Sequence, residues 1–423
     1  MPTFQTVRGM RDLPPQEAAM LNHVIVKARE TAELYGYNEV ITPVVEPYEL
    51  LAAKSGEEIR QRMFTFKDLG DRAVALRPEF TASIARLATT TLRKEPKPLR
   101  TFAVGTVYRY DEPQRGRYRE FWQSDFEIIG SNKPEADAEI LLLTNSLMQA
   151  VGLKNYAFKL GHIGVIRGIL AQHNVEEKTQ NTILQHMDKK EYTEALALAP
   201  EKCRVALEEL LKLKGDDAFE TTKKIQQHVA EYDEAKAAVD NLLDILELVT
   251  KSGCEVTTVE PAFARGLEYY TGMIFEVYIP ELDIALGGGG RYDRLIEAFG
   301  GEPTPATGVA HGIDRIVLAM QTQNLKPDIK QRKRTVVIPI KDSTKDAALR
   351  IAQTLRKAGV TVEFEIMGRK VAKALEDADK RGLDYAVIVG EKELQQNRVV
   401  LRNLSKREQT EVKLDELVEK IKN

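Results

Sequence analysis

The stretch TVYRYDEPQRGRYREFWQSDFEIIG, residues 106–130, predicts two β-strands joined by a short and very basic loop. Between Val107 and Asp111 the residue types alternate with a period of two, which is typical of a strand. The second strand runs from Phe121 to Ile129. Strands that return on each other in this way, with helices between them elsewhere in the chain, favour an α+β domain.

The loop of this stretch contains three arginines, Arg115, Arg117 and Arg119. Arginines spaced by one residue on an extended chain point to one side, and their planar forks suit the oxygens of a polyphosphate better than a single carboxylate. A solvated basic hairpin is the alternative interpretation. The polar residues Gln123 and Glu127 lie among apolar ones in the second strand, and they favour a binding site.

Length and composition are those of a soluble protein of two or three domains, with 423 residues of which 43% are hydrophobic and 30% charged. The formal net charge of -3 excludes a generally basic surface, so an RNA partner would have to use local patches. Cys203 and Cys254 form no CxxC motif, which argues against a zinc site and a disulfide framework. Because we find neither a signal peptide nor an apolar run of about 18 residues, we expect a cytoplasmic protein with no membrane partner.

The N-terminal part begins with a predicted amphipathic helix over residues 15–35, with Gly36 at its cap. The segment GYNEVITPVVEP, residues 36–47, reads as a strand broken by prolines. Proline cannot donate to a sheet ladder, so we expect this strand at a sheet edge or an interface. A hairpin that turns at residues 70–71 follows.

The pattern changes after residue 162, where strand signals give way to helical spacing. We expect a helical insertion over 163–252 rather than a part of the main domain's core. Beyond a polar linker, buried strands alternate with helices, which implies an α/β domain with a mostly parallel sheet. The predicted division is therefore a main domain over 1–162 and 253–321, the insertion over 163–252, a linker over 322–334 and a C-terminal domain over 335–423.

Two clusters could face a ligand from corners of the chain. In RPEFT, Glu79 and Thr81 lie two apart and can meet an ammonium group, although both are also favoured at a plain helix start. In ARGLEYYTG, the turn at Arg265 can present a guanidinium, and one of the two tyrosines can present a hydroxyl. A strand edge with a solvated arginine and two packed rings is the alternative.

Two further clusters are the glycine run LGGGGRYD and the segment GIDRI, where Arg315 lies on a predicted apolar helix. The run LGGGGRYD lets a backbone approach a ligand closely, but it is no dinucleotide or Walker loop, and a plain turn explains it as well. The six histidines show no metal-ligand spacing. Arginine recurs instead, and an inward arginine needs a strong anionic partner. Electrostatic stabilisation of phosphoryl transfer would follow from the convergence of Arg109, Arg117, Arg119, Arg265 and Arg315.

Taken together, these segments resemble the histidyl-tRNA synthetases, a family of class II aminoacyl-tRNA synthetases. GYNEVITPVVEP, YRYDEPQRGRYREFWQSDFEIIG and GVAHGIDRI are similar to the three class II motifs, and RGLEYYTG and GGGGRYD to two segments peculiar to the histidine enzymes. The likeness runs from VRGMRDLPP to the C-terminal domain. It implies an antiparallel-sheet catalytic domain with a helical insertion, a C-terminal α/β anticodon-binding domain, and a homodimer formed partly through the first motif.

The resemblance also implies roles for residues that match these motifs. For histidine binding they are Glu79, Thr81 and Gln123 at the ammonium group, and Glu127, Tyr270 and Tyr292 at the imidazole. For catalysis, at the α-phosphate and the histidine carboxylate, they are Arg109 and Arg265. For the rest of ATP they are Arg117, Arg119 and Arg315 at the outer phosphates and Phe121 at the adenine. Near the tRNA acceptor end it is Gln114.

The implied activity is the activation of L-histidine with ATP to histidyl-adenylate, followed by transfer to the 3′ end of tRNA(His). Mg²⁺ accompanies the nucleotide in the family, while the sequence shows no all-protein metal cage, so the metal ligands stay unassigned. The candidate RNA contacts of the C-terminal domain, each of which could equally be a solvated charge, are Arg369, Lys370, Lys373 and Arg398.

The chain departs from the family's usual pattern in two motifs. The second motif has Asp111 and Glu112 where Glu and Arg are more frequent, and the third has Asp314 where Glu is more frequent, with His311 as an unusual neighbour. One alternative is a regulatory paralogue that senses histidine without aminoacylating, and another is a class II synthetase of different specificity. The C-terminal domain and the motif arginines argue against the first, and RGLEYY with Glu127 against the second.

Overall fold

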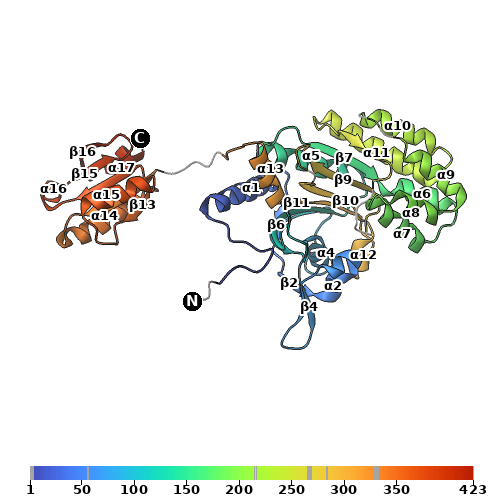
Figure 1. Cartoon of the computed structure of the whole chain (residues 1–423), viewed down its shortest axis with the longest axis horizontal. Coiled ribbons are helices and arrows are strands. Elements are labelled where there is room, and N and C mark those ends of the chain that lie inside the picture. Colours follow the sequence, from blue (N-terminus) through green and yellow to red (C-terminus); the bar gives the residue numbers. More distant parts are fainter. Residues whose placement is uncertain are drawn as a thin grey trace. The chain divides into compact units, whose positions relative to one another are not determined.

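The computed structural model describes residues 4–54, 57–213, 215, 217–263, 269–282, 284–327 and 333–422. The chain forms two compact units, Met1–Pro327 and Asp328–Asn423, and each is described by itself (Figure 1). Among the helices within these ranges, none has the length and apolar character that crossing a bilayer requires. Part of the predicted linker, 328–332, falls outside the described residues.

The first unit is built on an eight-stranded sheet in the order β1-β5-β6-β11-β10-β9-β7-β8. The neighbours from β5 through to β7 run antiparallel, while the outer pairs, β1 with β5 and β7 with β8, are parallel. This sheet, with helices on it, confirms the α+β prediction. Its strands are β1 (Asn38–Glu39), β5 (Leu99–Tyr108), β6 (Glu120–Ile129), β7 (Ala157–His162), β8 (Thr258–Val259), β9 (Met273–Tyr278), β10 (Gly287–Arg291) and β11 (Ala306–Gly312).

The central hairpin of β5 and β6 confirms the two strands predicted from residues 106–130. Because side chains alternate between the faces of a strand, Gln123 and Glu127 share one face of β6 and Phe126 lies on the other. Phe126 is fully buried and packs against Phe102 of β5, with ring centroids 4.6 Å apart. One face of the sheet thus carries polar side chains, and the opposite face carries core.

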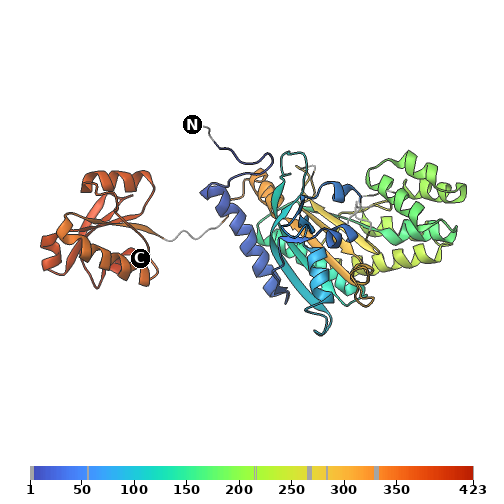
Figure 2. The same cartoon turned by 90° about the horizontal axis from the view of Figure 1, so that it is seen from below.

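Three helices, α1 (Pro15–Leu34), α5 (Pro134–Ala150) and α13 (Ile313–Thr322), contact one another or the sheet beside this core (Figure 2). The helical spacing predicted for the first of them is confirmed, because its apolar side chains are buried along one stripe. Gly36 has a φ of +72°, and its amide donates to the carbonyl of Glu33, which confirms the predicted cap.

The proline-broken segment 36–47 supplies two short edge strands, as predicted. β1 is at the edge of the large sheet, and β2 (Val45–Pro47) is at the edge of a three-stranded sheet in the order β2-β4-β3. The predicted hairpin is formed by β3 (Thr65–Lys67) and β4 (Ala73–Leu76). The short helices nearby are α2 (Tyr48–Lys54), α3 (Glu57–Gln61), α4 (Thr81–Thr89) and α12 (Leu295–Ala298).

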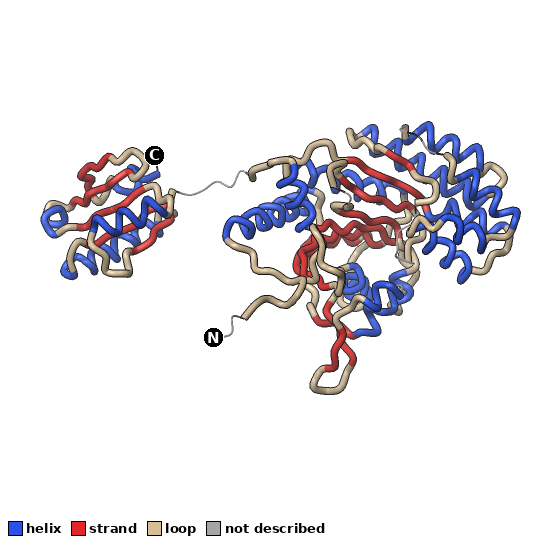
Figure 3. The backbone as a smooth tube through the Cα atoms, viewed as in Figure 1, coloured by secondary structure: helices blue, strands red, loops and turns tan. Residues whose placement is uncertain are grey.

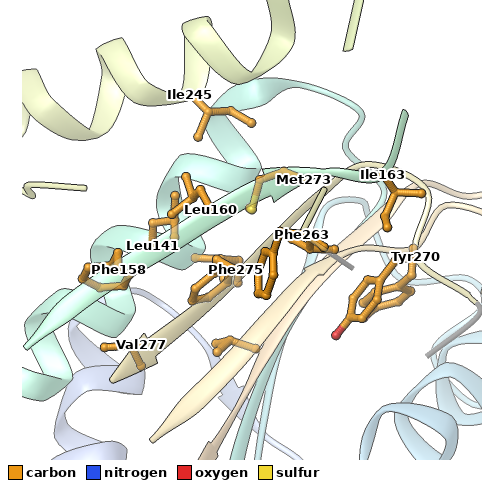
Figure 4. Close-up of a cluster of buried hydrophobic side chains, with 14 of the residues drawn as sticks. Leu141, Phe158, Leu160, Ile163, Ile245, Phe263, Tyr270, Met273, Phe275 and Val277 are labelled. Atoms are coloured by element: carbon orange, nitrogen blue, oxygen red, sulfur yellow. The ribbon is translucent and has the colours of Figure 1, made fainter. Parts of the chain in front are cut away.

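The segment 163–252 is helical, and its described residues contain no strand. Figures 1 and 2 show its helices gathered beyond one side of the sheet. These helices share one hydrophobic cluster with the sheet, so the segment packs on the core of the main domain, and its standing as a separate insertion stays a prediction. Figure 4 shows Ile245 of α11 above Leu160 and Met273 of the sheet. The helices are α6 (Ile163–Gln172), α7 (Glu177–Asp188), α8 (Tyr192–Leu198), α9 (Glu201–Leu210), α10 (Ala218–His228) and α11 (Asp233–Lys251).

The glycine run is a buried strand and not a plain turn. Gly287 to Gly290 form β10 between β9 and β11, and all four are buried. A Cβ built on Gly289 would lie 1.9 Å from the carbonyl oxygen of Gly308 on β11. Close approach of two backbones therefore explains why glycine is needed at Gly289, whereas the sequence had suggested close approach to a ligand.

The second unit is a five-stranded sheet in the order β13-β12-β14-β15-β16 with helices around it (Figure 3). Val337 belongs to the core under α14 and α17, and its neighbour Val336 to the core under α15, so both faces are covered. The predicted parallel sheet holds for β13, β12 and β14, but β15 and β16 pair antiparallel, and β16 and α16 were not foreseen. The elements are β12 (Arg334–Pro339), the 3₁₀ turn η1 (Asp342–Thr344), α14 (Lys345–Lys357), β13 (Thr361–Phe364), α15 (Val371–Lys380), β14 (Tyr385–Val389), α16 (Glu391–Gln395), β15 (Arg398–Asn403), β16 (Glu408–Lys413) and α17 (Leu417–Lys422).

Candidate active site

A pocket of about 260 Å³ opens on the polar face of the large sheet. Its walls come from β6, β10 and β11, from the beginnings of α4 and α13, and from the end of α7. The structure therefore gathers segments that are far apart in the sequence. The residues assigned to histidine or ATP from the sequence that line this pocket are Glu79, Thr81, Arg109, Phe121, Gln123, Glu127, Tyr270, Tyr292 and Arg315.

Glu127 and Tyr292 form a buried pair in the pocket wall. Only 1% of Glu127 and 3% of Tyr292 is exposed, and the tyrosine hydroxyl donates to Glu127 Oε2. Burial, together with the neighbouring carboxylate, raises the pKa of Tyr292 well above its ordinary value. A Cβ on Gly308 would lie 1.6 Å from Glu127 Oε2, so glycine at this position leaves the carboxylate its place.

The two tyrosines of the RGLEYYTG segment both line the pocket. Their rings are 4.6 Å apart, and the ring of Tyr269 also makes an edge contact with Tyr292 at 5.7 Å. Figure 4 shows Tyr270 at the end of the apolar cluster. Tyr270 thus belongs to the core and also lines the pocket, so a packed ring and a place beside a ligand are compatible.

Glu79 has a structural role as well as a place in the pocket. Its carboxylate accepts hydrogen bonds from the backbone amides of Thr81 at 2.8 Å and Ala82 at 3.1 Å, in the first turn of α4. The helix-start interpretation is therefore confirmed, and the ligand interpretation stays a prediction for a residue that lines the pocket.

Gln123 presents a buried polar atom that suits a ligand. The residue is 6% exposed, and its Oε1 has no hydrogen-bond partner among the residues that the structure describes. A buried acceptor left in this state costs about 1–3 kcal/mol. A donor that arrives with a bound ligand, such as an ammonium group, would recover this energy.

The cationic part of the pocket is formed by Arg109 and Arg315. Arg109 Nε donates to the carbonyl oxygen of Pro78 at 2.9 Å, and its guanidinium lies 5.3 Å from the ring centroid of Phe121. Arg315 Nη1 donates to the carbonyl oxygen of Ala285 at 2.9 Å. Backbone carbonyls therefore orient both guanidiniums, and an anionic ligand can meet two fixed positive charges.

The expectation that the loop arginines point to one side is wrong. Arg115 and Arg117 are exposed, whereas Arg119 is 5% exposed. The loop is not extended, because Gln114 and Arg117 form a β-bridge around a turn in which Gly116 has a φ of +74°. The alternation on which the prediction depended is lost at that turn.

Three of the predicted residues that the structure describes do not line the pocket. Gln114 and Arg119 line no part of it, and Arg117 lines an adjoining pocket of about 470 Å³. The Arg119 guanidinium lies 3.7 Å from the ring centroid of Tyr110. Arg265 falls outside the described residues.

Three lining residues with polar side chains were not assigned from the sequence: Arg62, Asp188 and Tyr269. Asp188 ends α7, and together with Arg315 it also lines the adjoining pocket. The helical segment 163–252 carries no motif that identifies this aspartate. Tyr269 lay in a quoted motif, where one ring was expected to belong to the core.

Arg291, from the GGGGRYD motif, has a supporting role. Its guanidinium forms an ion pair with Asp137 at 2.8 Å, and the two side chains are 7% and 0% exposed. It also contacts Asp293 at 3.0 Å. This buried network fixes the end of β10 beside Tyr292.

The structure adds no support to a protein metal site or to the RNA contacts considered from the sequence. In the ranges described, no group of three His, Cys, Asp or Glu side chains is arranged to hold a metal ion. In the C-terminal unit, Arg369, Lys373 and Arg398 each contact a carboxylate, and Lys370 is exposed. Both interpretations of these residues, as solvated surface charges and as RNA contacts, therefore stay open.

Acidification should destabilise the protein through His311, which is fully buried behind the pocket with Nε2 3.0 Å from the Thr144 hydroxyl. Burial lowers the pKa of His311 from 6.5 to about 3. The unfolded chain then binds the extra proton below pH 6.5, so stability is retained above that pH and falls as the pH decreases towards 3. We expect His311 to contribute a loss of about 2 kcal/mol between pH 7 and pH 5.

Urea unfolding at the two pH values measures this effect. In His311→Gln the loss between pH 7 and pH 5 should be smaller than in the natural chain, with His162, whose pKa burial lowers to about 4, accounting for a remaining part. Equal losses in the two proteins would contradict the prediction.

Comparison with known proteins shows the family to which this chain belongs. The family described as Histidyl-tRNA synthetase matches residues 9–316, and the family described as Anticodon binding domain matches 334–423. A histidine–tRNA ligase of Methanocaldococcus jannaschii is 40% identical over 98% of both chains, and one of Pyrococcus furiosus is 37% identical over 99% of both.

Solved structures agree with these relatives. The apo histidyl-tRNA synthetase of S. aureus superposes with a TM-score of 0.75 at 26% identity and covers 100% of both chains. The match of the C-terminal unit to an anticodon-binding domain argues against the regulatory alternative. The chain belongs to the histidyl-tRNA synthetase family of class II aminoacyl-tRNA synthetases and is an ATP-dependent histidine–tRNA ligase with a C-terminal anticodon-binding domain.

Proposed function

We propose that the pocket binds histidine against β6 and ATP towards α13. The observation that carries this assignment is the buried pair of Glu127 and Tyr292, which lies in the same wall as the available acceptor of Gln123. The carboxylate accepts from one imidazole nitrogen, and Tyr270 contributes a hydroxyl to the other. Gln123, with Glu79 and Thr81, receives the ammonium group.

The arginines then serve the first reaction step. Histidine attacks the α-phosphate of ATP through its carboxylate, pyrophosphate leaves, and histidyl-adenylate remains. Arg109 binds the α-phosphate, and its guanidinium next to Phe121 suits an adenine stacked on that ring. Positioning and charge neutralisation account for most of the acceleration in such transfers.

The outer phosphates are assigned to Arg315 and Arg117. Both line the adjoining pocket, which shares Arg315, Asp188 and Ala285 with the first one. Arg119 receives no such role here, because it is buried against Tyr110. Arg265 keeps the place beside the α-phosphate that its motif implies.

Mg²⁺ enters this scheme with the nucleotide. The described part of the chain offers no three-residue cluster for a metal ion, and Mg²⁺ commonly binds through substrate phosphates with one or two carboxylates. We therefore treat Mg²⁺ as part of the ATP substrate and assign it no protein cage. The role of Gln114, which is exposed on the loop, is contact with the acceptor end of tRNA(His) in the second step.

Pyrophosphate exchange with a panel of amino acids tests the proposal. Histidine alone should support exchange, because a site that pairs with both imidazole nitrogens leaves buried polar groups unmatched with other side chains. Exchange with another amino acid would favour a synthetase of different specificity. A complete absence of exchange would favour a regulatory protein.

The protein is further proposed to act as a homodimer in the cytoplasm. Apolar side chains around the first motif are exposed, with Leu34 at 85% and Ile41 at 92%, next to the open edge at β1. An exposed apolar patch beside a sheet edge suits a second copy of the chain. Both cysteines are unbonded and buried, which fits a reducing compartment.

Ile41→Asp should weaken the dimer by about 100-fold or more, since a carboxylate would have to be desolvated in the interface. Sedimentation or light scattering at micromolar concentration measures this. Val205→Asp is the matched control, because Val205 is 55% exposed on α9, within the helical segment. A mass unchanged in Ile41→Asp, or lowered equally in both variants, would contradict this interface.

A further inference from the structure

The N-terminal segment 7–11 lies on the loop between β5 and β6, and we refer to it as the strap. Figures 1 and 2 show the chain leaving its N-terminus, passing the sheet and then entering α1. The amide of Met10 donates to the carbonyl of Val7 at 2.9 Å, which closes a turn with Gly9 at a φ of +84°. Glycine at the third place of a turn is what this conformation needs.

The strap is joined to the loop by its backbone. The amide of Arg119 donates to the carbonyl oxygen of Gly9 at 2.8 Å. A Cβ on Gly9 would lie 2.7 Å from Arg119 Cγ and 3.1 Å from Pro113 Cγ, so the two segments are in close contact. The carbonyl of Arg119 in turn accepts from the amide of Arg109, the first arginine of the pocket.

The strap is joined to α13 by Arg11. Its guanidinium forms an ion pair with Asp314, which is 6% exposed, and its Cζ lies 3.6 Å from the ring centroid of Tyr118 in the loop. The second oxygen of Asp314 accepts from the backbone amide of Trp122 at 2.6 Å. One aspartate thus connects the strap, β6 and the start of α13.

Arg315, which follows Asp314 in α13, also connects this helix to the loop. Arg315 Nε donates to the carbonyl oxygen of Gly116, at the turn of the same loop, at 3.3 Å. The loop is therefore fixed at its turn by Arg315 and at its return by Arg119 and Tyr118, and the strap contacts both of these. Asp314 is also a place where the chain departs from the family's third motif.

We propose that Arg11 is a positioning residue for the ATP end of the site, and that the strap sets the loop and the start of α13 relative to each other. Through this contact Arg109 and Arg315 are presented to the same polyphosphate. The inference rests on the proposed function, because it assumes that these two arginines bind ATP. It predicts a defect in ATP use and none in histidine use, since the histidine wall is built by other contacts.

Steady-state exchange kinetics on the full chain test this with Arg11→Ala, Arg11→Lys and Arg8→Ala. We expect Arg11→Ala to raise the KM for ATP by about tenfold or more while the KM for histidine stays within about twofold, as for loss of a charge-assisted contact. Arg11→Lys should recover part of the loss, because it keeps the charge without the planar stacking group. Arg8→Ala is the matched control: its pair with Glu112 at 2.8 Å is 72% and 70% exposed, and such pairs contribute little.

A second readout comes from Trp122, the one tryptophan of the chain. Its emission spectrum should change in Arg11→Ala and remain unchanged in Arg8→Ala, because only the first removes the partner of Asp314. ATP titration followed by this emission should give a Kd raised by the same factor as the KM.

The kinetics of the Arg11 variants decide whether the strap positions the ATP end of the site. A raised KM for ATP alone, recovered in part by lysine, supports the strap. An unchanged KM for ATP in both Arg11 variants, or an equal rise in both KM values, overturns it. Arg109→Ala separates this from failure of the proposed function, since an unchanged KM and kcat in that variant would remove the ATP assignment itself.

Discussion

Glu127→Gln is expected to raise the KM for histidine by about 100-fold, or about 2.7 kcal/mol, which is the usual effect of losing a hydrogen bond to a buried charge. The side chain is 1% exposed, so water cannot replace the lost charge. Glutamine keeps the shape and can still accept from Tyr292, but it attracts an imidazole N–H less strongly. The KM for ATP should change little, because the substitution lies in the histidine wall.

Glu120→Gln is the control on the same strand. Glu120 also accepts from a tyrosine hydroxyl, that of Tyr108 at 3.0 Å, but it does not line the pocket. Its exchange kinetics should equal those of the natural chain. If both variants lose histidine affinity, general damage to β6 is the cause and the role assigned to Glu127 falls.

Gly308→Ala tests the role of the Glu127 carboxylate without replacing Glu127 itself. The added methyl group would lie 1.6 Å from Glu127 Oε2 and 2.6 Å from the carbonyl oxygen of Phe126. The carboxylate must then move, and histidine affinity should fall at least as far as in Glu127→Gln. A thermal melt separates this effect from a loss of folding.

Arg109→Ala is expected to lower the kcat of adenylate formation by about 10³-fold, the order found for removing a charge that stabilises phosphoryl transfer. Arg265→Ala should have an effect of the same order, as its motif implies. Arg109→Lys should recover little, because a lysine cannot present two parallel N–H groups to a phosphate. Single-turnover exchange with saturating histidine and ATP measures the chemical step.

Arg100→Ala is the matched control for Arg109→Ala. Arg100 lies on β5, the strand that Arg109 directly follows, and it pairs with Glu139 through two contacts of 2.8 Å, outside the pocket lining. Arg100→Ala should lower the stability slightly and leave kcat within about twofold of that of the natural chain, as expected for loss of a partly exposed ion pair. A kcat near normal in both Arg109→Ala and Arg265→Ala would exclude arginine as the source of the acceleration.

Patterns that repeat over a few residues were sufficient to predict most of the first unit. Helix α1 with its glycine cap, the hairpin of β5 and β6, and the edge strands around Pro43 follow from periods of 3.6 and 2 and from the missing N–H of proline. The same logic failed for β16 in the second unit. Its burial pattern is almost entirely exposed, so no apolar alternation marked it as a strand.

The candidate site was predictable where motif residues lie on regular elements. Gln123 and Glu127 on β6 and Arg315 on α13 line the pocket, because the strand and the helix determine where their side chains point. Asp188 was not predictable, since nothing local distinguishes it from other acidic residues of the helical segment. It reaches the pocket only because that segment packs on the sheet.

The sequence by itself determined the family, most strands and helices of the first unit, and most of the polar residues that meet at the pocket. The tertiary structure alone decided which arginines face that pocket. Arg119 is turned away by contacts with the strap around Gly9, and Asp314 is joined to Arg11, a residue 303 positions earlier in the chain. A side chain in a loop takes its direction from neighbours that only folding brings near it, and no local pattern records them.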